Sequence, residues 1–197
     1  MNIAAIVLAA GKSSRMGFNK LLADVGGKTL LTRTVENIRA SNVSRIFVVT
    51  GHQAADIELA LAQSQVSFVH NADYAGGIAS SVKAGVEAIQ NFDGGLICLG
   101  DMPLVSASVI DQMIEAFDPS HGRDLVLAVR HGEIGNPVLW GARYFPDLLQ
   151  LQGDRGGRGL IEAHHAAAIK ISVSEEGVLL DADTPEALAK LKSIAGF

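Results

Sequence analysis

The sequence predicts an α/β fold, a three-layer α/β/α sandwich around a mostly parallel, Rossmann-like sheet. Short runs rich in Val, Ile and Leu alternate with longer stretches in which apolar residues recur at helical spacing. Those runs are apolar at consecutive positions, which is typical of parallel strands covered on both faces. The 197 residues are enough to bury a substantial core. We therefore expect one domain over residues 1–197.

The strands are expected where the apolar runs are shortest and richest in β-branched residues. The first run ends at a glycine-rich segment, and the fourth ends at an aspartate. The predicted strands cover residues 3–8, 45–50, 66–69, 95–99, 125–129, 138–140 and 168–173.

The helices are expected between these strands. Apolar residues spaced i, i+3, i+4 and i+7 occur around residues 30–38, 57–61, 82–89 and 110–117, which predicts helices with one face against the sheet. Near the end of the chain, Thr184 followed by Pro185 is typical of an N-cap and a first helical turn. No linker and no internal repeat interrupts this pattern.

Composition narrows the class of protein. The formal net charge is -5, so the chain lacks the excess of Lys and Arg that nucleic-acid binding requires. The apolar start lacks a basic segment and is interrupted at Gly11, which predicts a cytoplasmic protein with no membrane span. The single cysteine, Cys98, lies in an apolar run, which predicts a buried thiol and no disulfide.

The segment LAAGKSSRMG, residues 8–17, follows the first strand and predicts a triphosphate loop. Glycines let backbone N–H groups approach phosphate oxygens, and Lys12, Arg15 and Lys20 would offset phosphate charge. The segment is not a P-loop, because Ile6 stands where that motif needs glycine, and Ser13 likewise breaks the dinucleotide fingerprint. A polar turn with scattered cations is the alternative interpretation.

Acidic residues follow two other predicted strands. Asp101 comes directly after the strand at 95–99, where a carboxylate is well placed to hold Mg²⁺. Its alternative role is a turn that opens a helix near Val105. Asp181 and Asp183 are two residues apart on an extended segment, so either is a candidate second ligand, and Asp183 is equally a candidate helix cap.

Six segments occur together that resemble the molybdenum cofactor cytidylyltransferase family, within the MobA-like nucleotidyltransferase superfamily. The likeness spans nearly the whole chain, although the family often has Gln where Met102 stands. The segments are LAAGKSSRMG at 8–17 with KLL at 20–22, GGIASSVKAG at 76–85, GDMP at 100–103, GNPVL at 135–139, GDRGGR at 153–158 and DADTP at 181–185.

The resemblance implies a CTP site and a magnesium site. Ala10 stands where guanylyl-transferring relatives typically have a second glycine, which favours cytosine. Catalysis is expected from Lys12, Arg15, Lys20 and Asp101, with Mg²⁺ on Asp101 and Asp183. The nucleotide is expected to contact Leu8, Ala10, Gly11, Lys12, Ser13, Arg15, Lys20, Ser80 and Ser81.

The resemblance also implies an acceptor, molybdopterin carrying molybdenum, with Asn136, Pro137, Asp154 and Arg155 on its side of the site. It further implies docking to a molybdoenzyme or its chaperone. Two other enzymes fit the motifs: a guanylyltransferase acting on the same pterin, and another cytidylyl or sugar-phosphate nucleotidyltransferase. A non-catalytic nucleotide or cofactor carrier is the interpretation from a different class.

Overall fold

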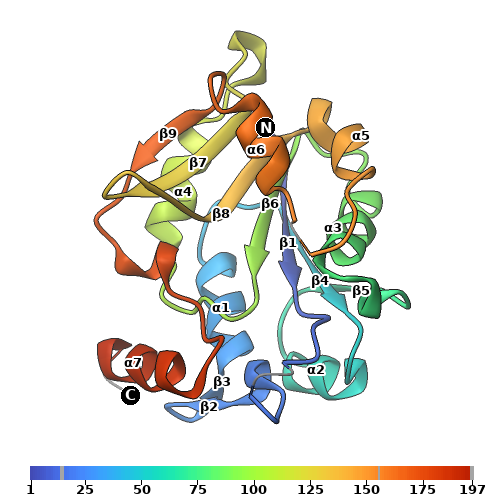
Figure 1. Ribbon diagram of the computed structural model, residues 1–197, viewed down its shortest axis with the longest axis vertical. Helices are drawn as coiled ribbons and strands as arrows, with labels where there is room; N and C mark the ends of the chain where they lie inside the picture. Colours follow the sequence, from blue (N-terminus) through green and yellow to red (C-terminus); the bar gives the residue numbers. More distant parts are fainter. Residues whose placement is uncertain (14–15, 155, 196–197) are drawn as a thin grey trace.

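The computed structural model describes residues 1–13, 16–154 and 156–195. Within these residues a seven-stranded sheet has the order β5-β4-β1-β6-β8-β7-β9 (Figure 1). A second, two-stranded sheet pairs β2 (Asp24–Val25) with β3 (Lys28–Thr29). The strands of the large sheet are β1 (Ile3–Leu8), β4 (Arg45–Thr50), β5 (Ser67–His70), β6 (Gly94–Leu99), β7 (Leu125–Arg130), β8 (Glu133–Gly141) and β9 (Ile169–Ser172).

The sheet is mostly parallel, as predicted. β1 pairs in parallel with both β4 and β6, β4 with β5, and β7 with β9. β8 is the exception, because it runs antiparallel to its neighbours β6 and β7. The carboxyl ends of β1, β4 and β6 therefore meet at one edge, the place where open α/β sheets bind ligands.

Helices cover both faces, which confirms the three-layer prediction (Figure 1). Alternate residues of each strand face opposite layers. Ala5 and Val7 belong to the core beneath α1 (Leu30–Arg39), α2 (Ala54–Ala60) and α4 (Ala107–Ala116). Ala4 and Ile6 belong to the core beneath α3 (Ile78–Glu87), α5 (Phe145–Leu148) and α6 (Arg158–His164).

The last helix, α7 (Pro185–Ala195), packs outside these layers. Its Leu188 and Leu191 join a third apolar cluster with Met16 and Leu30. The Thr184 hydroxyl accepts a hydrogen bond from the Ala187 amide, so Thr184 caps the helix as predicted. Short 3-10 helices complete the chain: η1 (Lys20–Leu22), η2 (Tyr74–Gly76), η3 (Pro119–His121), η4 (Ala142–Tyr144) and η5 (Glu176–Leu179).

The predicted strands match the structure to within a residue or so at most ends, with one clear exception. β8 begins at Glu133, five residues before the predicted 138. Asn136 and Pro137 therefore lie inside a strand, and Gly135 is extended there. A Cβ on Gly135 would collide with the Val178 carbonyl oxygen, so glycine is needed for close approach. Helices α5 and α6 were not predicted.

A tight crossing at the ligand edge places Asp101. Gly100 follows β6, and its amide donates a 3.1 Å hydrogen bond to the Leu8 carbonyl oxygen at the end of β1. A Cβ on Gly100 would lie 2.9 Å from that oxygen. The backbone therefore passes close beside β1, which brings Asp101 next to the loop that follows Leu8.

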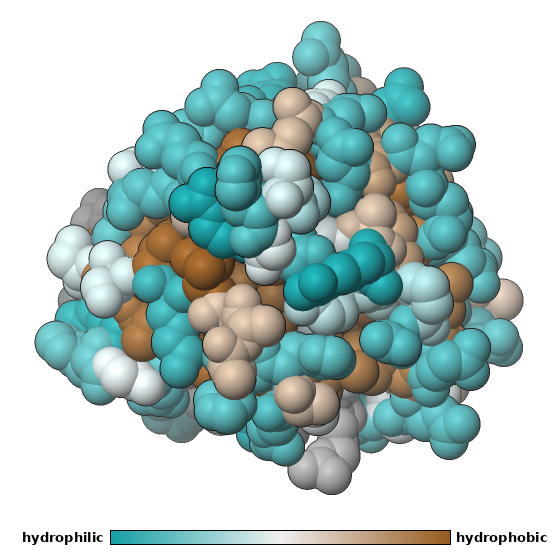
Figure 2. Space-filling view, turned by 90° about the horizontal axis from the view of Figure 1, so that it is seen from above, coloured by the Kyte–Doolittle hydropathy of each residue, from teal (hydrophilic) through white to brown (hydrophobic). Residues whose placement is uncertain are grey.

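The end of the molecule opposite the ligand-binding edge has a mostly hydrophilic surface (Figure 2). Figure 2 views it from above in Figure 1, and hydrophilic residues cover most of that face with hydrophobic residues showing between them. Among the described residues, no helix has the length and apolar character needed to cross a membrane.

Candidate active site

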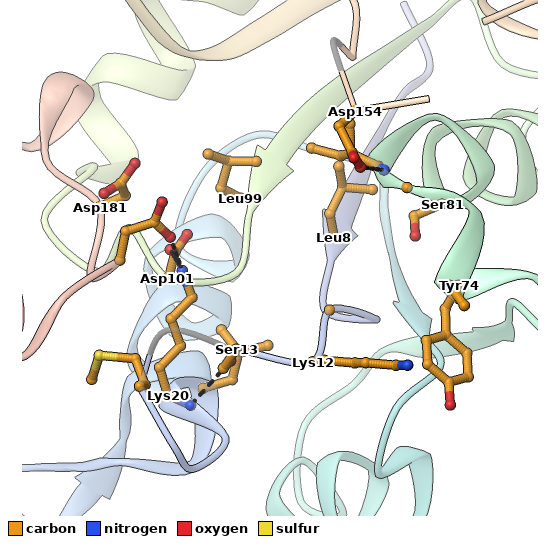
Figure 3. A pocket seen from close by; sticks show the side chains of 17 residues that line it. Leu8, Lys12, Ser13, Lys20, Tyr74, Ser81, Leu99, Asp101, Asp154 and Asp181 are labelled. Carbon is orange, nitrogen blue, oxygen red and sulfur yellow. Dashed lines mark hydrogen bonds and ion pairs between the residues drawn. The ribbon is translucent and has the colours of Figure 1, made fainter. Parts of the chain in front are cut away.

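A cavity of about 550 Å³ lies at the carboxyl ends of β1 and β6 (Figure 3). This volume is in the range of small-molecule sites. Its walls come from segments far apart in the sequence, namely the loop after β1, the start of α3, the loop after β6 and the segment before α7. The lining residues are Leu8, Gly11, Lys12, Ser13, Met16, Lys20, Leu21, Tyr74, Ala75, Gly77, Ile78, Ser81, Leu99, Asp101, Asp154, Asp181 and Asp183.

Two lysines predicted to contact the triphosphate line the cavity, Lys12 in the loop after β1 and Lys20 at the start of η1. Ser13 has a φ of 49°, and its hydroxyl accepts a 3.3 Å hydrogen bond from the Lys20 amide. This contact fixes the start of η1 and hence the main chain of Lys20. The exposed Lys12 points across the cavity, with its Nζ 5.6 Å from the centre of the Tyr74 ring (Figure 3).

Three carboxylates form the opposite wall, which we call the acidic triad: Asp101, Asp181 and Asp183. Each offers an oxygen that lies within 4.8 Å of those of the other two. Asp101 is buried, whereas the other two are partly exposed. Hard divalent cations take carboxylate oxygens, so the donor set and its spacing fit such a metal. Asp181, which the sequence left as an alternative to Asp183, lies in the same cluster.

Lys20 lies against this triad. Its Nζ donates a hydrogen bond to Oδ2 of Asp101 (Figure 3). It donates a second to Oδ1 of Asp183. Burial acts to lower the pKa of Lys20, but the two carboxylates outweigh it and raise the pKa above its usual value. The pKa of Asp181 is also raised, first by burial and then by the charges of Asp101 and Asp183. The triad therefore holds excess negative charge even with Lys20 in place.

The wall formed by α3 separates two adjacent serines. Ser81 is buried and lines the main cavity, whereas Ser80 lines a second cavity of about 460 Å³ together with His70 and Lys83. Asn71 joins them, because its Nδ2 donates to the Ser80 hydroxyl at 2.8 Å and to the Ser81 hydroxyl at 3.1 Å. The structure thus places Ser81 in the cavity predicted to hold the nucleotide and Ser80 in the second cavity.

Gly153 and Asp154, which lie in the segment that precedes α6, hold the start of α3. We call these two residues the 153–154 clasp. Asp154 Oδ1 accepts a 3.3 Å hydrogen bond from the Ile78 amide, and the Gly153 carbonyl accepts a 3.1 Å hydrogen bond from the Ala79 amide. These bonds satisfy amides that a helix N-terminus leaves free. Gly77, with a φ of 94°, passes so close that a Cβ would lie 2.7 Å from the Gly153 oxygen. Asp154 lines the cavity and has this structural role as well.

Other predicted site residues lie outside the main cavity. Ala10 is buried beneath it, and its carbonyl accepts a hydrogen bond from the His52 amide. Asn136 and Pro137 line a separate cavity of about 10 Å³ together with Cys98 and Met102. Cys98 is buried, as predicted, and burial raises the pKa of its thiol. Arg15 and Arg155 lie outside the described residues.

Tyr74 is a site residue that the sequence did not reveal. It follows β5 and reaches the cavity because Gly51, after β4, lacks a side chain. A Cβ on Gly51 would lie 2.6 Å from the Tyr74 Cβ and 2.9 Å from the Ala10 Cβ. The His52 ring packs against the Tyr74 ring with 6.0 Å between centres. No local pattern around residue 74 signals these contacts.

The chain matches the model of the MobA-like NTP transferase domain over residues 5–168. It is 29% identical over 182 residues to a molybdenum cofactor cytidylyltransferase from Escherichia coli (strain K12), covering 92% of this chain and 91% of that protein. It is 28% identical over 191 residues to the purine catabolism protein PucB from Bacillus subtilis (strain 168), with the same coverages. By contrast, it spans 29% of the length of a bifunctional protein GlmU from Francisella philomiragia, to which it is 36% identical over 140 residues.

A solved structure resembles the whole fold. A nucleotidyl transferase from Methanothermobacter superimposes with a TM-score of 0.85 at 26% identity, covering 98% of this chain and 97% of that one. The match therefore includes the sheet, both helical layers and the segment that carries Asp181 and Asp183. Together with the domain match, it confirms that the fold and the catalytic class are those of a nucleotidyltransferase.

Proposed function

The chain belongs to the MobA-like NTP transferase family, and from this premise we propose that it transfers CMP from CTP to molybdopterin. The acceptor would be the terminal phosphate of molybdenum-carrying molybdopterin, and the products would be molybdopterin cytosine dinucleotide and pyrophosphate. One observation carries the proposal: two lysines that follow β1 and a cluster of three carboxylates line the same cavity. The full-length likeness to a molybdenum cofactor cytidylyltransferase supports this choice of acceptor.

The triphosphate would bind the loop after β1. The backbone at Gly11, the Ser13 hydroxyl and the two lysines supply donors and positive charge for phosphate oxygens. Arg15 is proposed to add to this set from outside the described residues. Ser81 and Leu8 line the same cavity and would contact the ribose and the base. The preference for cytosine is proposed from Ala10 alone.

The metal would be Mg²⁺, held by Asp101 and Asp183 with Asp181 beside them. When bound, it would neutralise charge on the substrate phosphates. Asp101 is positioned for this by the tight crossing at Gly100, so its carboxylate stays near the triphosphate loop. Lys12 and Lys20 would offset the charge that develops on the leaving pyrophosphate.

The acceptor would enter beside the 153–154 clasp. Asp154 lines the cavity there, and Arg155 follows it in the sequence. Asn136 and Pro137 would act through Met102, the neighbour of Asp101, with which they share the small cavity. The acceptor phosphate is already anionic near neutral pH, so no general base is required. The site's task is to align it with the α-phosphorus of CTP.

The first test is pyrophosphate release with Mg²⁺ and molybdenum-loaded molybdopterin, with CTP and GTP in separate reactions. We expect release with CTP, its loss in Asp101→Asn, and normal release in Asp147→Asn, an exposed aspartate outside the cavity lining. Release with GTP alone would overturn the Ala10 argument. Activity in Asp101→Asn equal to that of the parent would sink the metal assignment.

A different acceptor is the second candidate, because the chain is 28% identical to the purine catabolism protein and 29% identical to the molybdenum cofactor cytidylyltransferase over the same shares of each protein. The same assay therefore needs sugar phosphates and other phosphorylated acceptors in place of molybdopterin. Release with one of these and none with molybdopterin would replace the pterin reaction by that one. Nucleotide binding with no release in any mixture would favour the carrier interpretation.

A further inference from the structure

The ammonium group of Lys20 occupies the place that a metal ion would need. Its Nζ donates to one oxygen of Asp101 and one of Asp183, the two residues proposed to hold Mg²⁺. The side chains of Lys20 and Asp101 are only 15% and 8% exposed, whereas that of Asp183 is 44% exposed. Lys20 is therefore an internal cation at the acidic triad.

A metal ion and Lys20 cannot share these oxygens in this arrangement. Mg²⁺ binds carboxylate oxygens at about 2.0–2.1 Å, so an ion held by the same two oxygens would lie within a few ångströms of Nζ. Two cations at such a distance repel, and the burial of the Lys20 and Asp101 side chains strengthens that repulsion. Metal binding through Oδ2 of Asp101 and Oδ1 of Asp183 therefore requires the Lys20 side chain to move.

The main chain of Lys20 limits where the ammonium group goes. Its amide is bound to the Ser13 hydroxyl, and Asn19 caps η1 through the Leu21 amide. The backbone thus stays beside the triphosphate loop while the four-carbon side chain rotates. Triphosphate oxygens in that loop offer Lys20 a new anionic partner within its reach.

We propose that Lys20 is the resident counter-ion of the acidic triad, and that a divalent cation binds tightly only when a nucleoside triphosphate draws Lys20 away. This inference rests on the proposed assignment of the triad as the metal site. It makes Lys20 a coupling residue, which joins metal binding to nucleotide binding. The metal then enters with the nucleotide and not before it.

Lys12 provides a matched control. It has the same charge, belongs to the same loop and lines the same cavity. Its ammonium group lies over the Tyr74 ring and not on the triad. Removing Lys12 changes the net charge of the cavity as much as removing Lys20 does, but it vacates no carboxylate oxygen.

The experiment measures Mn²⁺ binding without nucleotide, by calorimetry or by the electron paramagnetic resonance signal of free Mn²⁺. We expect Lys20→Gln to bind Mn²⁺ at least about tenfold more tightly than the parent. Lys12→Gln should stay within about threefold of the parent. Equal or weaker Mn²⁺ binding by Lys20→Gln would overturn the proposal, as would an equal gain in both variants.

Thermal unfolding gives a second readout. In EDTA, Lys20→Gln lacks the ammonium group that bonds Asp101 and Asp183, so its Tm should fall below that of the parent, and Mn²⁺ should restore it. Should Lys20→Gln fail to fold, Lys20→Arg carries the test, because arginine keeps the charge. We expect Lys20→Arg to bind Mn²⁺ no more tightly than the parent, and tighter binding would overturn the proposal.

These measurements are separable from the proposed reaction. Tight Mn²⁺ binding by Lys20→Gln, with no pyrophosphate release from the parent in any mixture, would sink the reaction and leave the role of Lys20 standing. Release by the parent, with unchanged Mn²⁺ binding in the variant, would do the reverse.

Discussion

The two lysines of the cavity have the same side chain and opposite surroundings. Lys20 is half-buried and bonded to two carboxylates, whereas Lys12 is exposed and lies over an aromatic ring. A lysine on an aromatic face gives up a modest attraction of about 0.5–1 kcal/mol when it turns to a phosphate. When a lysine between two carboxylates turns to a phosphate, the negative charge of both carboxylates loses its counter-ion. The neighbours of each lysine, not its charge, decide what else must change when a ligand arrives.

The walls behind these lysines differ in the same way. The acidic wall consists of three neighbouring carboxylates, and the positive charge of Lys20 holds two of them, Asp101 and Asp183, together. The α3 wall is fastened by backbone geometry, through the 153–154 clasp. We therefore expect changes to the acidic wall to act mainly on catalysis, and changes to the clasp to act mainly on stability.

Metal removal should give the largest effect. With EDTA in excess, pyrophosphate release should fall to background, because the triad then holds no divalent cation to neutralise the charge of the substrate phosphates. Adding Mg²⁺ or Mn²⁺ in excess of the chelator should restore it. Full activity in EDTA would mean that the acidic wall works without a metal.

Substitution within the triad should rank its members. Asp183→Asn should lower kcat/KM by about 10²–10³-fold, the size found for removing one preorganised electrostatic group. Asp181→Asn should lower it less, since no hydrogen bond joins Asp181 to Lys20 in the described part of the chain and the proposal does not require Asp181 as a metal ligand. A larger loss in Asp181→Asn would exchange the two roles. Steady-state kinetics measure both.

Breaking the clasp should affect folding first. Asp154→Ala removes the acceptor for the Ile78 amide, and losing such a cap costs about 1 kcal/mol of unfolding free energy. Urea denaturation measures this, with Asp147→Ala, an exposed helical aspartate, as the control. A stable Asp154→Ala protein with much weakened acceptor binding would instead place Asp154 on the substrate.

The smallest effect is expected at Tyr74. Tyr74→Leu removes the aromatic face under Lys12, and KM for CTP should change by about two- to fivefold, as expected for an exposed cation–π contact. Tyr74→Phe keeps the ring and should behave like the parent. A loss in Tyr74→Phe equal to that in Tyr74→Leu would show that the hydroxyl, not the ring, matters.

Sequence reasoning located the parts of the site that are local. The triphosphate loop and Asp101 each follow a buried strand, so an apolar run ending in polar residues was sufficient signal. Ser80 and Ser81 required more, because neighbours on a helix point about 100° apart and only the packed face of α3 selects Ser81. The clasp joins residues 76 positions apart, between Ile78 and Asp154, and no sequence period reports such a contact.

The missed elements have physical reasons too. α5 is only 4 residues long, too short for a clear helical period. The early part of β8 contains Gly135 and Pro137, residue types that argue against a strand. At Gly135, close packing of the backbone against Val178 outweighs the low preference of glycine for strands.

The hydrogen bonds of the 153–154 clasp can also report how often the cavity opens. The amides of Ile78 and Ala79 are held by residues from a distant segment; Ile78 lines the main cavity, and Ala79 lines the second cavity. Any widening of the cavity on that side must release these two amide protons to solvent. Their hydrogen-exchange rates, followed one residue at a time, would therefore report how often the empty site opens and how firmly each bound ligand keeps it shut.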